Sequence, residues 1–403
     1  MFFCFLYIMK KKICVTAAVF VMSNVANALT VYDKDGTQLY LDGRVMSVFY
    51  GPNYNKAGVK DAAITTSGRF GIGGKTQITS WVSGLGYAQW DVANDSNDSH
   101  FKARDQWVAL DFGQYGLVKM GRYVDATYFV EQLTDYWEDA AGIQQGKFNG
   151  ERRSSQLSYI YDNYGFYGRL GVQFAEDNAR IWNMGEVLNN KYAIDSGFNL
   201  ALGYTFDKVW FGPISIRAAY SYLRGQDEND TTQSDVIVND VLIVPSRGLG
   251  FKNFYHVNGG ISWGDIHNGF YVALIGEYAC MRQPNLYKDT KIINKGGEFL
   301  VGYAFGNGLE VRTSYQMTMW EFMASADSGV GGYDGLKIKN KRVPVFVNYK
   351  FNPNFDVWAE CGFNAGSDHN IDHIGNGEAW QEDSTIGLAQ DKFVWSLGAR
   401  YTF

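Results

Sequence analysis

Apolar and polar residues alternate strictly along several stretches of the chain. From Phe393 to Phe403 the odd positions hold Phe, Trp, Leu, Ala, Tyr and Phe, whereas the even positions hold Val, Ser, Gly, Arg and Thr. The same alternation runs from Leu309 to Met319 and from Phe198 to Phe206. A period of two is that of a β-strand, whose successive side chains point to opposite faces of the sheet. The pattern alone fits both a soluble β-sandwich and a membrane barrel.

Sixteen segments of this kind are separated by turn residues or by longer polar stretches. Most have at least the roughly 9–11 residues that a tilted strand needs to cross a bilayer. They cover residues 38–50, 67–80, 82–92, 102–112, 116–124, 153–162, 165–175, 196–206, 209–223, 254–265, 269–282, 296–305, 308–320, 342–351, 354–364 and 391–403.

The connections between these segments are alternately short and long. The short ones carry turn residues, such as Asp162-Asn163 and Asn352-Pro353. The long ones are polar and cover residues 51–66, 93–101, 125–152, 176–195, 224–253, 283–295, 321–341 and 365–390. Outer-membrane barrels have short periplasmic turns and long outer loops, whereas a sandwich has no reason for this regularity. We therefore predict an all-β fold, a transmembrane antiparallel barrel of sixteen strands.

The N-terminus is typical of a secretory signal peptide. Three lysines precede the apolar segment 13–22, which is too short to span a bilayer, and Ala26-Asn27-Ala28 is a small-residue cleavage site. We expect residues 1–28 to be the signal peptide, with Met9 as the true start, and residues 29–403 to form the barrel.

Composition and charge narrow the classes of partner. The chain has 46 Gly, 27 Tyr, 27 Phe and 11 Trp without any linker, which favours one large β domain, and aromatic residues recur at strand ends as in membrane girdles. Loss of residues 1–28 removes three lysines and no acids, so the net charge changes from −6 to −9. An acidic chain lacks the cluster of basic residues that a nucleic-acid-binding protein needs.

The expected mature chain has two cysteines, Cys280 and Cys361. They are too few for a disulfide framework, and we expect them to be free thiols.

Many charged residues fall on the face of the strands that points away from lipid. A charge facing lipid at mid-bilayer costs about 2–4 kcal/mol, so a wet interior is the favourable place for these side chains. Sixteen strands leave room for a water-filled channel. The inward charges are Arg44, Arg69, Lys75, Arg104, Arg152, Arg169, Arg217, Glu310, Arg312 and Arg400.

The connection between Arg122 and Arg152 is far longer than the usual 4–6 residues, and long loops of this kind are commonly functional. It is rich in acids, and Lys147 is its one lysine. An acidic loop of this length within a regular β pattern indicates that this third loop has a task of its own.

Several motifs resemble the general diffusion porins of Gram-negative bacteria, a family of trimeric sixteen-stranded outer-membrane proteins. Val31-Tyr32-Asp33-Lys34-Asp35-Gly36-Thr37 and the following residues up to Arg44 resemble the family's opening strand. Gly86-Tyr87-Ala88-Gln89-Trp90-Asp91 resembles its third strand, and the chain ends on the family's terminal phenylalanine, Phe403. The resemblance covers residues 31–403, with the strands matching best.

The resemblance implies that the third loop folds into the barrel and narrows the pore, and that the function is passive. In the family, a ladder of basic wall residues faces acids on the third loop, and small hydrophilic solutes and ions diffuse through the transverse field between them. The loop tip Glu138-Asp139-Ala140-Ala141-Gly142 departs from the family's Pro-Glu-Phe-Gly-Gly, which affects the expected loop path. The implied constriction residues are Arg44, Arg69, Arg104 and Arg152 on the wall, the wall acid Asp91, and Tyr128, Asp135 and Asp139 on the loop.

The resemblance also implies a homotrimer in the cell outer membrane, in contact with lipid and lipopolysaccharide. The second loop, which latches the neighbouring subunit in the family, is short here. Asp95 or Asp98 would reach Arg122 or Arg152 of a neighbour. The loop acids Glu131, Asp135, Glu138 and Asp139 also predict a mild cation preference, through the field that they set at the channel mouth.

Other functions are less well supported. A substrate-specific channel, for sugars or an anion such as phosphate, is the alternative; a sugar channel needs an aromatic track, and the predicted lumen shows only Tyr40, Tyr167 and a few others. No arrangement of residues suggests an enzyme or a cofactor site. The histidines lack the close spacing of a zinc site, so no metal is expected.

Overall fold

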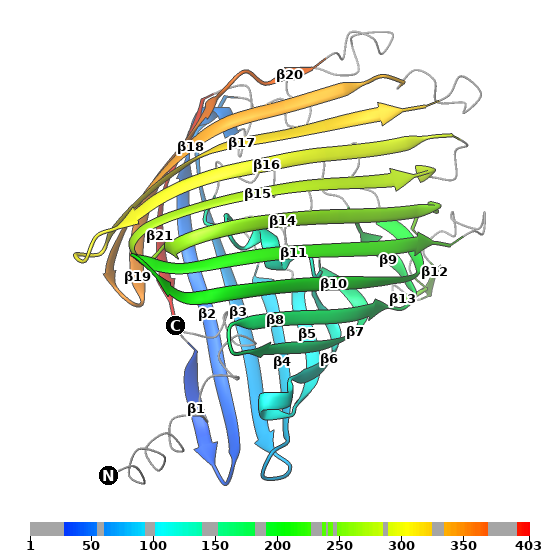
Figure 1. The fold of residues 1–403 in the computed structure, drawn as a ribbon, viewed down its shortest axis with the longest axis vertical. Coiled ribbons are helices and arrows are strands. Elements are labelled where there is room, and N and C mark those ends of the chain that lie inside the picture. Colours follow the sequence, from blue (N-terminus) through cyan, green and yellow to red (C-terminus); the bar gives the residue numbers. More distant parts are fainter. Residues whose placement is uncertain are drawn as a thin grey trace.

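The structure is a computed structural model (Figure 1). It describes residues 28–54, 60–92, 101–138, 152–181, 191–226, 236–238, 241–244, 248–284, 289–324, 334–369 and 393–403. The predicted signal peptide, apart from its last residue, lies outside these ranges. In the described part of the chain, no helix has the length and apolar character to cross a membrane.

Nineteen strands of the described residues form one sheet, of which three are short additions to longer neighbours: β1 (Leu29–Lys34), β9 (Glu176–Arg180) and β20 (Asp368–His369). The remaining sixteen pair with their neighbours in antiparallel fashion and close into a barrel, as the sequence predicted. They are β2 (Thr37–Tyr50), β3 (Ala63–Gln77), β4 (Ser83–Val92), β5 (Lys102–Asp111), β6 (Leu117–Val124), β7 (Arg152–Asn163), β8 (Phe166–Gln173), β10 (Lys191–Val209), β11 (Gly212–Gly225), β14 (Asn253–Asp265), β15 (Asn268–Arg282), β16 (Lys291–Ala304), β17 (Leu309–Met323), β18 (Lys337–Asn352), β19 (Phe355–Asn364) and β21 (Val394–Thr402).

The barrel closes at strand β2, which pairs with both ends of the chain. Strand β1 pairs with the first part of β2, and β21 pairs with the remainder from Arg44 to Tyr50. Figure 1 shows β1 and the C-terminus beside β2 at this seam. The backbones of Phe403 and Gly43 exchange two hydrogen bonds of 2.9 Å. A Cβ on residue 43 would lie 2.5 Å from the Phe403 ring, so the closure requires glycine there.

Burial is reversed relative to a soluble β protein. In β17 the polar residues Glu310, Gln316 and Thr318 are at most 5% exposed, whereas the apolar Tyr315 and Met317 are more than 40% exposed. Polar side chains therefore face the inside and apolar ones face out, where lipid would cover them. This asymmetry excludes the sandwich, in which the apolar face would form the core.

Tight turns join the strands at one end of the barrel, next to a band of aromatic rings. The turn at Tyr164 and Gly165 has two successive positive φ angles of 55° and 78°, as in a type I′ hairpin. Phe211 stacks on Trp263 with ring centroids 4.1 Å apart, and Phe270 and Trp210 adjoin this pair. Such amphipathic rings suit a membrane interface.

The strands differ from the prediction mainly on the side of the long loops. Strand β10 begins at Lys191 rather than 196, and β18 begins at Lys337 rather than 342, because ladder hydrogen bonds continue past the apolar stretch. The sixteen predicted segments do not include β1, β9, β20, or the small hairpin of β12 (Val236–Val238) and β13 (Val241–Val244). Cys280 and Cys361 are free cysteines, as expected.

Candidate functional site

The third loop enters the barrel, as the sequence predicted. Its described part, residues 125–138, includes one turn of helix, α2 (Tyr128–Glu131), and follows the inner face of the wall. Wall side chains hold the loop through its backbone carbonyls. Asn258 donates to the Thr127 carbonyl at 2.9 Å, Arg217 to the Phe129 carbonyl at 2.8 Å and Tyr271 to the Leu133 carbonyl at 2.7 Å.

Apolar packing holds the same part of the loop. Ala126, Phe129, Val130 and Leu133 are at most 9% exposed, and they form one cluster with small and aliphatic wall residues. Small wall residues such as Ala219 allow the loop to approach the strands closely. The path of the loop is thus fixed by packing as well as by hydrogen bonds.

Buried wall acids hold the far end of the described loop. The Trp137 indole donates to Glu298 at 2.9 Å, and the Glu138 backbone N–H donates to Glu360 at 2.7 Å. The Glu138 side chain is 2.6 Å from the Arg400 guanidinium. Burial alone would raise the pKa of the Glu138 carboxyl, but the guanidinium groups of Arg400 and Arg44 hold it below its ordinary value.

Neither Glu298 nor Glu360 was among the residues predicted from the sequence. Both lie on the inward face of their strands and are at most 2% exposed, so alternation would have marked them as inward acids. Their partners on the loop could not be read from the sequence.

The basic wall residues share a cavity with the loop. Arg44, Arg69, Arg104 and Arg152 line one cavity in the barrel. Asp91 bridges two of them, 3.1 Å from Arg69 and 3.0 Å from Arg104. Arg152 pairs instead with Asp105 at 3.2 Å, an acid that the sequence analysis did not name.

The loop contributes Tyr128, Asp135 and Glu138 to the lining of that cavity. The Tyr128 hydroxyl donates to Asp135 at 2.7 Å. Burial and the Asp135 carboxylate raise the pKa of the Tyr128 hydroxyl well above its ordinary value. Asp139, the other loop acid expected at the constriction, lies outside the described residues, as do Asp95 and Asp98 of the second loop.

The remaining inward charges make contacts along the wall. Arg169 donates to the Val124 carbonyl at 2.9 Å, and Arg217 lies 4.4 Å over the Phe129 ring. Glu310 pairs with Lys350 at 2.7 Å and is 3.7 Å from Arg312. Lys75 is half-buried on β3.

Two residues of the predicted site make other contacts than expected. Glu131, counted among the acids that face the ladder, is fully buried and points instead to His256 and Glu277 on the wall. Its position at the end of α2 turns it away from the cavity. Arg122, expected at a subunit contact, lies 3.9 Å from Glu176 and 3.4 Å from Ser154 within its own chain.

A buried ion pair at the start of the loop was also missed. Arg153 and Asp125 form a very short contact, and both are at most 3% exposed. Arg153 also donates to Ser221 at 3.2 Å. Because a register irregularity interrupts the β6–β7 pairing here, simple alternation does not predict that both Arg152 and Arg153 point inward.

The lumen contains more aromatic side chains than alternation indicated. Tyr40, Tyr87, Trp107 and Tyr123 line the same cavity and are at most 8% exposed. Tyr87 lies 6.4 Å from Tyr40 and 5.7 Å from Trp107, measured between ring centroids. Because these rings pack on one another, little of their aromatic surface is exposed for a solute to stack on.

Comparisons with known proteins agree with this architecture. The chain is 25% identical to the putative outer membrane porin protein NmpC of Escherichia coli over 358 residues, which cover 86% of this chain and 90% of that protein. It is 24% identical to outer membrane porin N of Escherichia coli over 387 residues, which cover 90% of this chain and 94% of that protein.

Solved structures match over nearly the whole barrel. OmpF of Salmonella typhi, in complex with daunomycin, has a TM-score of 0.65 at 20% identity and covers 93% of this chain and 100% of its own. An anion-selective porin from Comamonas acidovorans has a TM-score of 0.59 at 14% identity, and it covers 91% of this chain and 100% of its own. The sequence profile of the Gram-negative porin family matches residues 15–403. The chain belongs to the Gram-negative porin family of outer-membrane channels.

Proposed function

We propose that this outer-membrane porin passes small hydrophilic solutes and ions through a waist formed by the third loop and the arginine wall. The observation that carries the proposal is the position of Asp135 and Glu138 in the same cavity as Arg44, Arg69 and Arg104. Asp139 and Arg152 complete the proposed constriction, together with Asp91 and Tyr128.

The chemistry of this waist is electrostatic. Guanidinium groups on one side and carboxylates on the other set a field across the channel, in which small polar molecules orient while they stay hydrated. Apolar solutes would have to displace ordered water, and large ones are excluded by size. Selectivity then depends on pore diameter and on the lining groups rather than on tight binding.

A mild cation preference is part of the proposal, and it rests on the acidic balance of the chain. Two of the four loop acids contribute less to it than expected, because Glu131 is buried against the wall and Glu138 pairs with Arg400. The reversal potential of a single channel in a dilute KCl gradient measures the preference. A value on the anion side would contradict it.

The homotrimer and the contact with lipopolysaccharide are also proposals. They follow from membership of the family and from the apolar outer face. Arg122 would meet a neighbour's second loop only if it shared its contact with Glu176. Chemical cross-linking in mild detergent tests the assembly, and a product that stays monomeric would count against it.

Conductance in a planar bilayer, combined with liposome swelling by sugars of increasing size, tests the general function. A general diffusion channel gives an ohmic current and swelling rates that decrease smoothly with solute size. The alternative, a channel for one sugar or anion, predicts that this solute blocks the ion current at low concentration. The closely packed lumen rings around Trp107 argue against a sugar track.

A further inference from the structure

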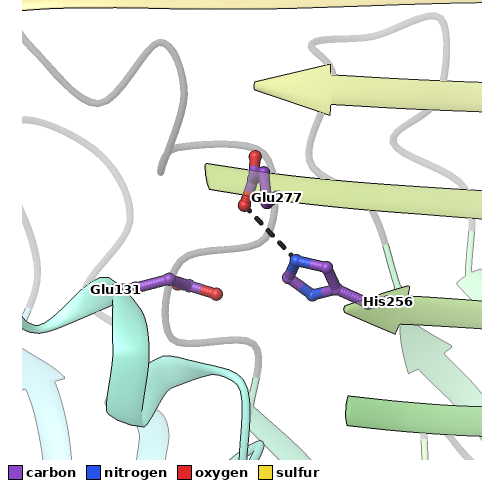
Figure 2. A group of neighbouring side chains, drawn as sticks. All are labelled: Glu131, His256 and Glu277. Atoms are coloured by element: carbon purple, nitrogen blue, oxygen red, sulfur yellow. Dashed lines mark hydrogen bonds and ion pairs between the residues drawn. The ribbon is translucent and has the colours of Figure 1, made fainter. Parts of the chain in front are cut away.

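Three buried side chains with metal-binding atoms meet where the third loop touches the wall: Glu131, His256 and Glu277. One ligand atom from each lies within 4.8 Å of the other two. The three residues are at most 8% exposed. Figure 2 shows the Glu131 carboxylate extending from its helix toward the imidazole, with Glu277 above the two and joined to His256 by the dashed line. We propose that these residues form a site for a divalent transition metal, with Zn²⁺ as the best-suited ion, that links the third loop to the barrel wall.

The β14–β15 hairpin brings the two wall ligands together. His256 pairs with Ala279 across the two strands and Asn258 pairs with Glu277, so His256 and Glu277 are diagonal neighbours on the inner face. Diagonal neighbours in a sheet are within reach of long side chains. His256 Nε2 and Glu277 Oε2 are 3.3 Å apart. This matches the separation of about 3.3 Å between two ligands of a tetrahedral zinc ion with bonds of about 2.0–2.1 Å.

The third ligand comes from a loop that is already fixed in place. Asn258, on the same strand as His256, donates to the Thr127 carbonyl at 2.9 Å and so holds the beginning of α2 against the wall. Glu131 is the last residue of that helix. One of its carboxylate oxygens lies within 4.8 Å of the ligand atoms of His256 and Glu277, and we expect the side chain to turn toward them when the metal binds.

A polar neighbour orients the Glu277 carboxylate. With the amide of Asn294 turned so that its nitrogen faces Glu277, it donates to Glu277 Oε1 at 3.3 Å and accepts from the Trp320 indole at 3.1 Å. Hydrogen bonds of this kind to ligating carboxylates are a regular feature of metal sites. The bond from Asn294 engages Glu277 Oε1, so Glu277 Oε2 is the oxygen that faces the imidazole.

The ligand set and its charge favour zinc over calcium or magnesium. One imidazole and two carboxylates suit a borderline ion with four ligands, whereas calcium takes six to eight oxygens and magnesium retains several waters. Two buried carboxylates are costly unless a positive charge balances them. A dication would supply that charge, and a water molecule would complete the coordination. The rival arrangement is a protonated His256 shared between the two glutamates.

The barrel contains a natural comparison for this site. His267 lies 3.0 Å from Glu310, which is also a contact between histidine and glutamate. There the neighbouring group is Lys350, 2.7 Å from the carboxylate, in place of a second acid. A cation next to the pair opposes metal binding, so the two histidines should behave differently.

Metal binding to the purified full-length protein tests the proposal. The protein is stripped with a chelator and titrated with Zn²⁺, and bound metal is measured by mass spectrometry and by the visible absorption of a Co²⁺ substitute. We expect about one Zn²⁺ per chain, no displacement by excess Ca²⁺, and a rise in the unfolding temperature on binding. Glu131→Gln, His256→Asn and Glu277→Gln should each weaken binding at least tenfold, and His267→Asn should leave it unchanged.

Two results would overturn the proposal. One is the absence of stoichiometric binding, which would favour the shared proton. The other is equal binding by wild type and by the His256→Asn/Glu277→Gln double variant, which would assign the metal to surface groups or bound lipopolysaccharide. None of these measurements depends on ion conduction, so the metal site and the proposed waist can fail independently.

Discussion

Replacement of Arg69 and Arg104 with serine tests the proposed waist most directly. These guanidinium groups lie 3.1 and 3.0 Å from the two oxygens of Asp91, so the three side chains together carry one net positive charge. The double variant would leave the carboxylate alone, with one net negative charge. It would also remove two long side chains from the cavity, so conductance should rise.

The magnitude of the selectivity change follows from Coulomb's law. A unit charge about 7 Å from a passing ion in water contributes about 0.6 kcal/mol, and a Debye length of about 10 Å at 0.1 M salt reduces this by about half. A change of two charges therefore favours a cation by about 0.6 kcal/mol and disfavours an anion equally. The cation-to-anion permeability ratio should rise by about 1.2 kcal/mol, or about eightfold. In 1 M salt, with a Debye length of about 3 Å, the change should be less than about twofold.

The assay is the single-channel reversal potential in a KCl gradient, measured at low and at high salt. The control is the matched Arg69→Lys/Arg104→Lys variant, which keeps both charges but loses the guanidinium geometry. It should keep the wild-type ion preference. An unchanged or more anion-selective reversal potential in the serine variant would refute the placement of these residues at the waist.

Three further predictions concern the loop and its supports. Asp135→Asn should move the reversal potential toward anions, by less than the double serine variant moves it toward cations, because one charge changes instead of two; no shift at 0.1 M KCl would exclude Asp135 from the ion path. Asp125→Ala leaves the buried Arg153 guanidinium without its carboxylate, which should cost about 3–5 kcal/mol; a denaturant midpoint equal to that of wild type would contradict this. Trp137→Phe removes the hydrogen bond to Glu298 while keeping an aromatic side chain, and it should increase open-channel current noise without changing the mean conductance greatly; current noise equal to that of wild type would contradict this.

The sequence alone determined the barrel and, wherever the alternation is regular, the side of the strand that carries charge. Alternation with a period of two is a local property, and a membrane forces apolar side chains outward along every spanning strand. Arg44, Arg69 and Arg104 could therefore be placed inside before their neighbours were known. The stretch after Arg122 was recognised as the third loop because it is long and shows no alternation of apolar and polar residues.

Only the tertiary structure decided which charges meet. The contact of Glu138 with Arg400 joins residues 262 positions apart, and that of Trp137 with Glu298 joins residues 161 positions apart. Such pairs depend on barrel closure, strand register and the packing of the loop on small wall residues. None of these produces a periodic pattern in the sequence. The same holds for Glu131, which the sequence placed with the acids at the waist. One turn of helix directs it to the wall instead, where the β14–β15 register has brought His256 and Glu277 together.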